Sequence, residues 1–280
     1  MKNIKYALKE MHARKEVIVS FNLFNNASIS GVLRAAKEVN RPVILGVTEP
    51  DLKRYGIEEL AATVKIKADR AGVDAALHLD HSMNLELVMR CIYVGFSSIM
   101  IDPSDLEMEQ RTEVVKEVVE AGMTSNIMVE SMVGHPKTTA LGAQNGENVT
   151  EELTDPEEAA VFANETGVDL LAVSVGTGHD RALTCGQVKL DLPLLKAIAE
   201  KVPQPLVIHG GSSIDEAQLR EIRNYNVGKV NIGTVIRLAY KDAIVKALAE
   251  NPHIDMVAAD AIGEDAIYRV ALEKMRILSC

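Results

Sequence analysis

Short apolar runs alternate with longer amphipathic stretches over most of the chain. Each run is almost continuously apolar, as expected for the strands of a parallel sheet whose two faces are both covered. The runs are VIVSFN (17–22), PVILGV (42–47), AALHLD (75–80), SSIMID (97–102), NIMVES (126–131), DLLAVSV (169–175), PLVIHGG (205–211) and KVNIGT (229–234). There are eight runs, so we expect eight strands.

The stretches between the runs have the spacing of amphipathic helices, most clearly over residues 27–40, 84–95 and 155–167. Many of them end in Gly or Asn, which is a signal for a helix C-terminus. The segment TDPEEA adds an N-terminal cap, Thr154 or Asp155, followed by an early proline. Another helix is expected over about 256–276, near the C-terminus.

Eight strand–helix units in 280 residues predict an α/β protein, a single-domain (β/α)8 TIM barrel over residues 1–280. An open, doubly wound sheet is the alternative. One connection is unusually long, because residues 132–153 separate the fifth strand from its helix. A connection of this length is typical of a lid or a binding loop, so we expect a mobile loop over about 132–153.

The composition narrows the classes of function. The formal net charge is −10, and Lys and Arg are scattered, so a nucleic-acid partner is not expected. Cys91, Cys185 and Cys280 form no CxxC pair, which argues against a disulfide framework or a Cys-rich zinc site. No apolar stretch approaches the ~20 residues that span a bilayer, and the N-terminus lacks the apolar core of a signal peptide. We therefore expect a cytoplasmic protein with no membrane partner.

Polar residues stand where the predicted strands end, and in a (β/α)8 barrel these ends together form the active site. They are Asn22, Thr48, Asp80, His81, Asp102, Glu130, His179, His209 and Asn231. A lone histidine is more commonly a structural, hydrogen-bonded residue. Three histidines on one rim, however, can hold a zinc ion and leave its fourth position open to a substrate. The pattern therefore predicts a catalytic metal site.

Asp80 is expected to act beside the metal rather than to bind it. Adjacent residues of a strand point in different directions, so Asp80 and His81 need not reach one atom. A carboxylate in this position can transfer a proton. Alternatively, it accepts a hydrogen bond from a ligand histidine. Asp102 and Glu130 are further candidates for that supporting role.

Two glycine-rich segments follow the seventh and eighth strands, HGGSSID from His209 and NIGT from Asn231. Many (β/α)8 barrels bind a phosphate there through backbone N–H groups and a helix N-terminus. The candidate residues are Gly210, Gly211, Ser212, Ser213, Gly233 and Thr234. Glycine and serine also make ordinary turns, and it is the position after strand seven that favours phosphate binding.

The longer motifs resemble the class II, metal-dependent ketose-bisphosphate aldolases, the family of fructose- and tagatose-bisphosphate aldolases. The resemblance runs nearly from end to end. It includes SFNLFNN, RPVILGVTE, HLDHS, GFSSIMID, TDPEEAAVFANETGVDLLAVSVGTGH, VKLDLPLLKAI, PLVIHGGSSI and KVNIGT. The motifs HLDH, GTGH and HGGSS, in this order and spacing, are its most specific part.

The resemblance implies reversible aldol cleavage of a ketose 1-phosphate or 1,6-bisphosphate into dihydroxyacetone phosphate and an aldehyde, through a zinc-stabilised enediolate. It identifies His81, His179 and His209 as the metal ligands. It also identifies Asp80 as the residue that transfers the proton of the C4 hydroxyl. Asn22, Asn231 and the backbone after His209 are expected to hold the dihydroxyacetone phosphate half. The implied cofactor is one Zn²⁺ per chain, or another divalent metal, and the family often has a monovalent cation near that phosphate.

The chain departs from the family pattern in several places. Met132 replaces the second Glu of VEAELG, and Asp180 replaces a Gly after the second ligand histidine. The segment GAQNGEN replaces the Gly-Gly-Gln-Glu-Asp of the family's mobile loop. Its Glu147 is therefore the candidate acid for the C1 proton, or else a solvated loop carboxylate. The segment NPHIDMVAADA lacks the Arg that grips the far phosphate, and Arg181 is the candidate replacement.

We therefore expect a divergent aldehyde-lyase of carbohydrate metabolism that acts on a small sugar phosphate as a homodimer or homotetramer. One alternative is a non-catalytic subunit of an aldolase complex that binds a sugar phosphate or metal. The combination of Asp80 with three histidines argues against it, because binding alone requires no proton transfer. The other alternative is an isomerase or epimerase on the same fold, which leaves the motif match unexplained.

Overall fold

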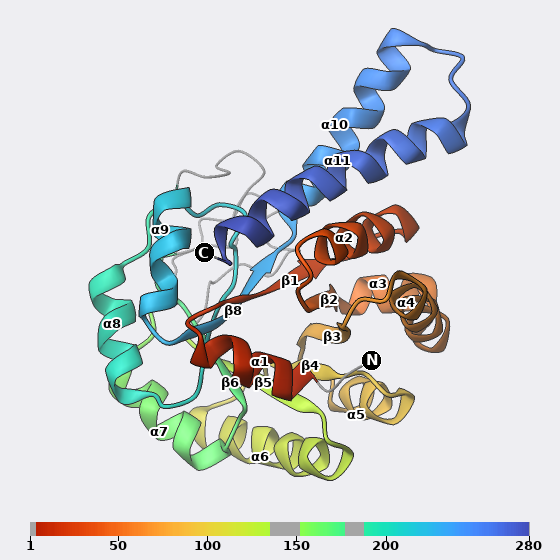
Figure 1. Cartoon of the computed structure of the whole chain (residues 1–280). Helices are drawn as coiled ribbons and strands as arrows, with labels where there is room; N and C mark the ends of the chain where they lie inside the picture. Colours follow the sequence, from red (N-terminus) through yellow and green to blue (C-terminus); the bar gives the residue numbers. More distant parts are fainter. Residues whose placement is uncertain (1–3, 135–151, 177–187, 280) are drawn as a thin grey trace.

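The computed structural model describes residues 4–134, 152–176 and 188–279, and Figure 1 shows their arrangement. Eight parallel strands close into a barrel in the order of the sequence. The strands are β1 Ile18–Asn22, β2 Val43–Val47, β3 Ala75–Ser82, β4 Ser98–Ile101, β5 Met128–Val133, β6 Leu170–Val173, β7 Leu206–Ile208 and β8 Val227–Ile232. The single-domain (β/α)8 TIM barrel is confirmed, and the open sheet is excluded.

Helices surround the barrel on all sides (Figure 1). They are α1 Ile4–Ala13, α2 Asn26–Glu38, α3 Glu49–Tyr55, α4 Ile57–Ala71, α5 Leu85–Val94, α6 Met108–Ser125, α7 Pro156–Thr166, α8 Leu192–Lys201, α9 Glu216–Glu221, α10 Thr234–Glu250 and α11 Met256–Ile277, with a 3-10 turn η2 at Ile222–Asn224. None of these described helices is long and apolar enough to cross a membrane.

Local sequence signals set the ends of these helices. The side chain of Asp155, rather than that of Thr154, caps α7 by accepting hydrogen bonds from the backbone of Glu157 and Glu158. Pro156 occupies the first turn, where no N–H donor is needed. Gly167 ends the helix in the left-handed region, with φ of 68°.

The barrel interior is apolar at one end and polar at the other. Helix α1 closes the N-terminal end of the strands, where Leu8 and Met11 belong to one buried cluster with Ile18 and Met100. The larger core lies between the outer faces of the strands and the surrounding helices. Polar side chains are therefore concentrated towards the carboxyl ends of the strands, where active sites of this fold lie.

Strands β5 and β8 are each shifted along the chain by two residues from the sequence-based expectation. Strand β5 begins two residues later than expected, because Asn126 takes a left-handed conformation, with φ of 56°, to end α6. Glu130 therefore lies in the middle of β5 rather than at its end. Strand β8 ends at Ile232, because Gly233 is already the cap of α10 and Thr234 is its first residue. The long connection expected from residue 132 begins only after β5, and residues 135–151 lie outside the described part of the chain.

Helices α10 and α11 form a hairpin that projects away from the barrel (Figure 1). Helix α11 packs against α10 and also against α2. The turn of the hairpin extends beyond the barrel (Figure 1). Near this turn, the apolar side chains of Val245, Met256 and Val257 are exposed.

Candidate active site

A bulge in β3 brings two adjacent residues to the same place. The pairing of β3 with β4 shifts register between Leu79 and Ser82, and His81 has a φ of 49° in the left-handed region. Such a bulge redirects side chains that would otherwise alternate. Single ligand atoms of Asp80, His81 and His209 all lie within 4.8 Å of one another. Strand alternation alone would direct Asp80 and His81 apart, and the bulge brings their side chains close together.

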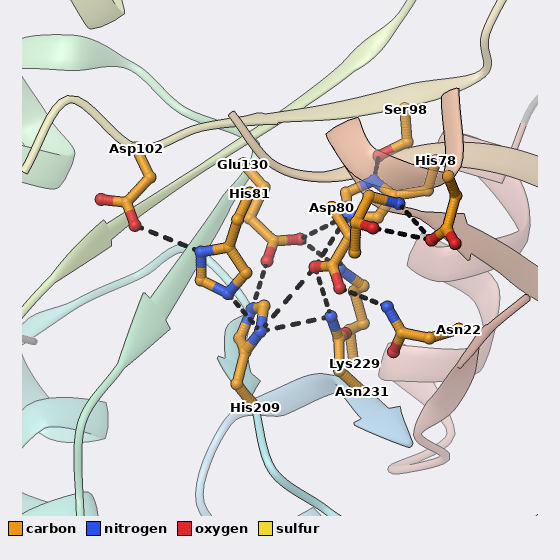
Figure 2. Close-up of polar contacts among 12 residues, drawn as sticks. Asn22, His78, Asp80, His81, Ser98, Asp102, Glu130, His209, Lys229 and Asn231 are labelled. Atoms are coloured by element: carbon orange, nitrogen blue, oxygen red, sulfur yellow. Dashed lines mark hydrogen bonds and ion pairs between the residues drawn. The ribbon is translucent and has the colours of Figure 1, made fainter. Parts of the chain in front are cut away.

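Asp102 fixes the orientation of the His81 ring. Its Oδ2 atom lies 3.2 Å from Nδ1 of His81, just beyond the end of β4 (Figure 2). This contact favours the tautomer with the proton on Nδ1, because a carboxylate only accepts hydrogen bonds. Nε2 of His81 then faces the barrel mouth, where it lies 3.1 Å from Nδ1 of His209.

Glu130 fixes the orientation of the His209 ring, but it holds Nε2 of this ring, whereas Asp102 holds Nδ1 of His81. Nε2 of His209 donates to Oε1 of Glu130 at 2.9 Å, so Nδ1 is the nitrogen without a proton. Asn231 supports this assignment, since its side-chain Nδ2 donates to the same Nδ1 at 3.3 Å. Both histidines thus direct a lone pair to one point, and each has a carboxylate behind it (Figure 2).

The charges around this pair favour a cation between the two rings. Burial opposes a charged His81, but its hydrogen bond to Asp102 and the charges of Asp80 and Asp102 raise its pKa overall. Burial and the neighbouring His81 lower the pKa of His209. Positive charge is therefore stabilised near Nε2 of His81. A divalent metal fits this place, because two imidazole lone pairs and a carboxylate oxygen are ligands that Zn²⁺ accepts.

Asp80 is held as a carboxylate beside the two histidines. Nδ2 of Asn22 donates to its Oδ2 at 2.5 Å, and Nδ2 of Asn231 donates to its Oδ1 at 2.9 Å. Burial would raise its pKa, but the charges of His81 and His209 outweigh burial and lower it. Asp80 is consequently ionised at neutral pH, as a group that takes up a proton must be.

A second polar layer, absent from the sequence-based expectations, lies deeper in the barrel. Nζ of Lys229 donates to Oε2 of Glu130 at 2.6 Å and contacts Nε2 of His78 at 3.0 Å. Nδ1 of His78 lies 2.9 Å from Oγ of Ser98. Lys229 and His78 are fully buried. The sequence did contain one indication of this layer. Lys229 lies two residues before Asn231, so both side chains point to the same face of β8.

The pKa values in this layer follow from burial and from the lysine charge. Burial would raise the pKa of Glu130, but Lys229 and the hydrogen bond from His209 lower it to about 2. Burial, followed by the charge of Lys229, lowers the pKa of His78 to about 3. Glu130 is therefore charged and His78 neutral at pH 7, which matches their roles as acceptors from Lys229.

The glycine-rich segments that follow β7 and β8 lie side by side, since the backbone N–H of Gly211 donates to the carbonyl of Asn231 at 2.9 Å. Gly210 has φ of 69°, and a side chain at Gly211 would lie 2.4 Å from Val230, so both turn positions require glycine. Oγ of Ser212 accepts a hydrogen bond from the backbone N–H of Val235, in the first turn of α10. The turn after β7 is thereby fixed against the N-terminus of α10. Gly233 lies against Asn22, since a Cβ atom there would be 3.2 Å from the Asn22 side chain.

The remaining candidate residues divide into two groups. His179, Glu147, Asp180 and Arg181 lie outside the described residues. Met132, by contrast, is buried inside the barrel in the same apolar cluster as Ala172. A thioether there offers no hard oxygen ligand to a metal.

The whole chain matches known aldolases. A family sequence model described as fructose-bisphosphate aldolase class-II matches residues 2–280. The structure is similar to the YdjI aldolase from Escherichia coli K12, with 27% identity, a TM-score of 0.83, and coverage of 98% of this chain and 96% of that chain.

Two further solved structures share the fold at lower identity. A putative fructose-1,6-bisphosphate aldolase from Coccidioides immitis is 23% identical, with a TM-score of 0.83 and coverage of 99% of this chain and 96% of that one. The fructose-bisphosphate aldolase from Campylobacter jejuni is 21% identical, with a TM-score of 0.80 and coverage of 98% and 93%, respectively.

Proposed function

The chain belongs to the class-II fructose-bisphosphate aldolase family, and from this premise we propose that it cleaves and forms a ketose 1-phosphate or 1,6-bisphosphate. The products of cleavage would be dihydroxyacetone phosphate and an aldehyde. The observation that carries the proposal is the convergence of Asp80, His81 and His209, whose ligand atoms lie within 4.8 Å of one another. A proton acceptor and two aligned metal ligands are what a metal-dependent aldol cleavage requires.

We propose that His81 and His209 bind one Zn²⁺ per chain through Nε2 and Nδ1, respectively. The third ligand in this proposal is His179, which lies outside the described residues. Bound there, the ion would supply Lewis-acid chemistry, withdrawing electron density from the ketone carbonyl as the C3–C4 bond breaks. Asp102 and Glu130 hold the two rings so that their lone pairs converge.

Asp80 has the surroundings of a proton acceptor. It is ionised, nearly buried, and held by the amides of Asn22 and Asn231. In cleavage it would take the proton of the C4 hydroxyl, and in condensation it would return it. The proposed second acid, Glu147, lies outside the described residues.

Asn231 has one atom still available to a substrate. Its Nδ2 is engaged by Asp80 and His209, while its buried Oδ1 has no hydrogen-bond partner among the described residues. We propose that Oδ1 accepts a hydrogen bond from a hydroxyl of the dihydroxyacetone phosphate half. The phosphate of that half would bind the N–H groups of the turn after β7 and the start of α10, together with a monovalent cation.

The helical hairpin supports a homodimer or homotetramer. Near its turn, Val257 is 77% exposed and Met256 is 63% exposed, and Val245 on the facing helix is 60% exposed. These three side chains are left largely uncovered by the described part of the chain. We propose that a second copy of the chain covers this surface. A reducing, cytoplasmic location fits the buried free thiol of Cys91.

A coupled assay for dihydroxyacetone phosphate tests the proposed reaction directly. Fructose 1,6-bisphosphate, tagatose 1,6-bisphosphate and the matching ketose 1-phosphates are supplied to the purified protein. We expect cleavage of at least one of them, its loss after treatment with a chelator, and its return with Zn²⁺. An enzyme that cleaves these ketoses equally well after complete metal removal would contradict the metal-dependent mechanism.

A further inference from the structure

The fully buried lysine in the barrel contacts groups behind the histidine pair rather than the pair itself. Lys229 projects inward from β8, one step below Asn231 on the same face of the strand. Its ammonium group has no exposure to solvent. A charge in this position is costly unless it is paired, so the arrangement of its partners decides what it does.

The hydrogen bonds of this layer have one consistent direction. Lys229 can only donate, so Nε2 of His78 at 3.0 Å must accept, and Nδ1 of His78 then donates to Ser98. Lys229 also donates to Oε2 of Glu130 at 2.6 Å. The other oxygen of Glu130 accepts from Nε2 of His209 at 2.9 Å. The nitrogen that carries each proton in this chain of contacts therefore follows from whether its neighbour can donate or accept.

We propose that Lys229 is a positioning residue, which acts through Glu130 to hold His209 in the tautomer and orientation that direct Nδ1 at the metal. The inference rests on the proposed function, because it concerns the same metal site. The lysine itself touches neither the metal ligands nor the region where a substrate would bind. His78 completes the arrangement, since its Nε2 accepts a second hydrogen bond from the same ammonium group.

The choice of oxygen on Glu130 favours this role over one in stability alone. A lysine that merely neutralised a buried carboxylate could contact either oxygen of Glu130. Lys229 contacts the oxygen that does not face His209, which leaves the other oxygen for the histidine. Partners behind a metal ligand typically change metal affinity by about 10–100-fold.

The affinity of the purified apoprotein for Zn²⁺, measured by competition with a chromophoric chelator, tests this inference. We expect Lys229→Met to weaken Zn²⁺ binding by about 10–100-fold. The double variant Lys229→Met/Glu130→Gln should regain at least about tenfold of that loss, because the amide oxygen of glutamine can accept from His209 without leaving a buried charge unpaired. Ser20→Ala is the matched control, since Ser20 is equally buried in β1 and its Oγ has no partner among the described residues.

Two results would overturn the inference. One is a folded Lys229→Met protein with a lower Tm and an unchanged Kd for Zn²⁺, which is the signature of a role in stability alone. The other is a double variant that binds Zn²⁺ no better than Lys229→Met. A wild-type chain that binds no Zn²⁺ would contradict the proposed function together with this inference, whereas wild-type binding with no effect of the variants contradicts this inference only.

Histidine ¹⁵N spectra of the wild-type apoprotein provide a second test, which measures tautomers instead of metal affinity. The expected state has Nδ1 of His209 and Nε2 of His78 without protons, assigned by comparison with His78→Gln. The opposite tautomer at His209 would show that Glu130 does not set its orientation, and would overturn the inference.

Discussion

Oδ2 of Asp102 lies 3.2 Å from Nδ1 of His81, and the other nitrogen of that ring faces His209. The two residues come from neighbouring strands, and the bulge at His81 turns the ring towards the barrel mouth. The contact therefore links a backbone irregularity to the direction of a proposed metal ligand.

Asp102→Ala should weaken Zn²⁺ binding by about 10–100-fold, because the His81 ring loses the acceptor that selects its tautomer. Competition with a chelator measures the affinity, and thermal unfolding checks that the protein is folded. Asp105→Ala is the matched control, since Asp105 is an exposed carboxylate three residues further along the chain. Equal affinities of the two variants would show that Asp102 does not orient His81.

Elemental analysis should detect about one Zn²⁺ per wild-type chain, and His81→Ala, His209→Ala and His179→Ala should each be strongly depleted. Loss of one of three protein ligands leaves too few donors for a tetrahedral site. His253→Ala provides the control, because His253 lies in the exposed turn between α10 and α11. A folded His179→Ala protein with full zinc content would remove His179 from the ligand set.

Asp80→Asn should lower kcat by about 10²–10⁴-fold, which is the usual contribution of a positioned acid or base. The amide keeps the shape of the side chain but cannot take up a proton. Zinc content should stay near that of the wild type. If zinc is lost and the activity per bound zinc is unchanged, Asp80 is a ligand or a structural support instead.

The ends of most strands were predictable to within two residues, because a polar residue or glycine stands at the end of each β-rich run or directly after it. The direction of Asp80 and His81 was not, since strand alternation predicts that neighbouring side chains diverge and a bulge is a property of the folded backbone. The layer of Lys229, Glu130 and His78 was missed for a different reason. Its contacts join residues 99 and 151 positions apart, which only barrel closure brings together.

Glu130 illustrates how a small shift in position changes an interpretation. The sequence indicated a residue at the end of the fifth strand, on the rim of the barrel. Because β5 starts at Met128, Glu130 lies one layer lower and is fully buried. Its role as an acceptor behind a histidine was among the expectations, but its partnership with Lys229 depends on this depth.

A charge at the turn of the helical hairpin should separate the proposed oligomer. Val257→Lys places an ammonium on the apolar surface that a second copy would bury, where an unpaired charge is costly. Light scattering coupled to size-exclusion chromatography should show a smaller mass than for the wild type. Tyr93→Lys is the control, because Tyr93 is 91% exposed on α5, away from the hairpin. Equal masses for the wild type and Val257→Lys would contradict this interface.

The enzyme should discriminate more strongly at the C1 phosphate of the ketose than at its far end. The glycine-rich turns and Asn231 form the site proposed for the dihydroxyacetone phosphate half, whereas the segment NPHIDMVAADA lacks the arginine that would hold a far phosphate. One charge-assisted contact is worth about 1.5–3 kcal/mol, which corresponds to roughly 10- to 150-fold. We therefore expect removal of the far phosphate from fructose 1,6-bisphosphate to lower kcat/KM by less than about tenfold, and removal of the C1 phosphate to lower it much more. Steady-state kinetics with the two monophosphates measure both effects. A thousandfold preference for the bisphosphate would instead reveal a cationic site for the far end, and Arg181→Ala would then test whether that residue provides it.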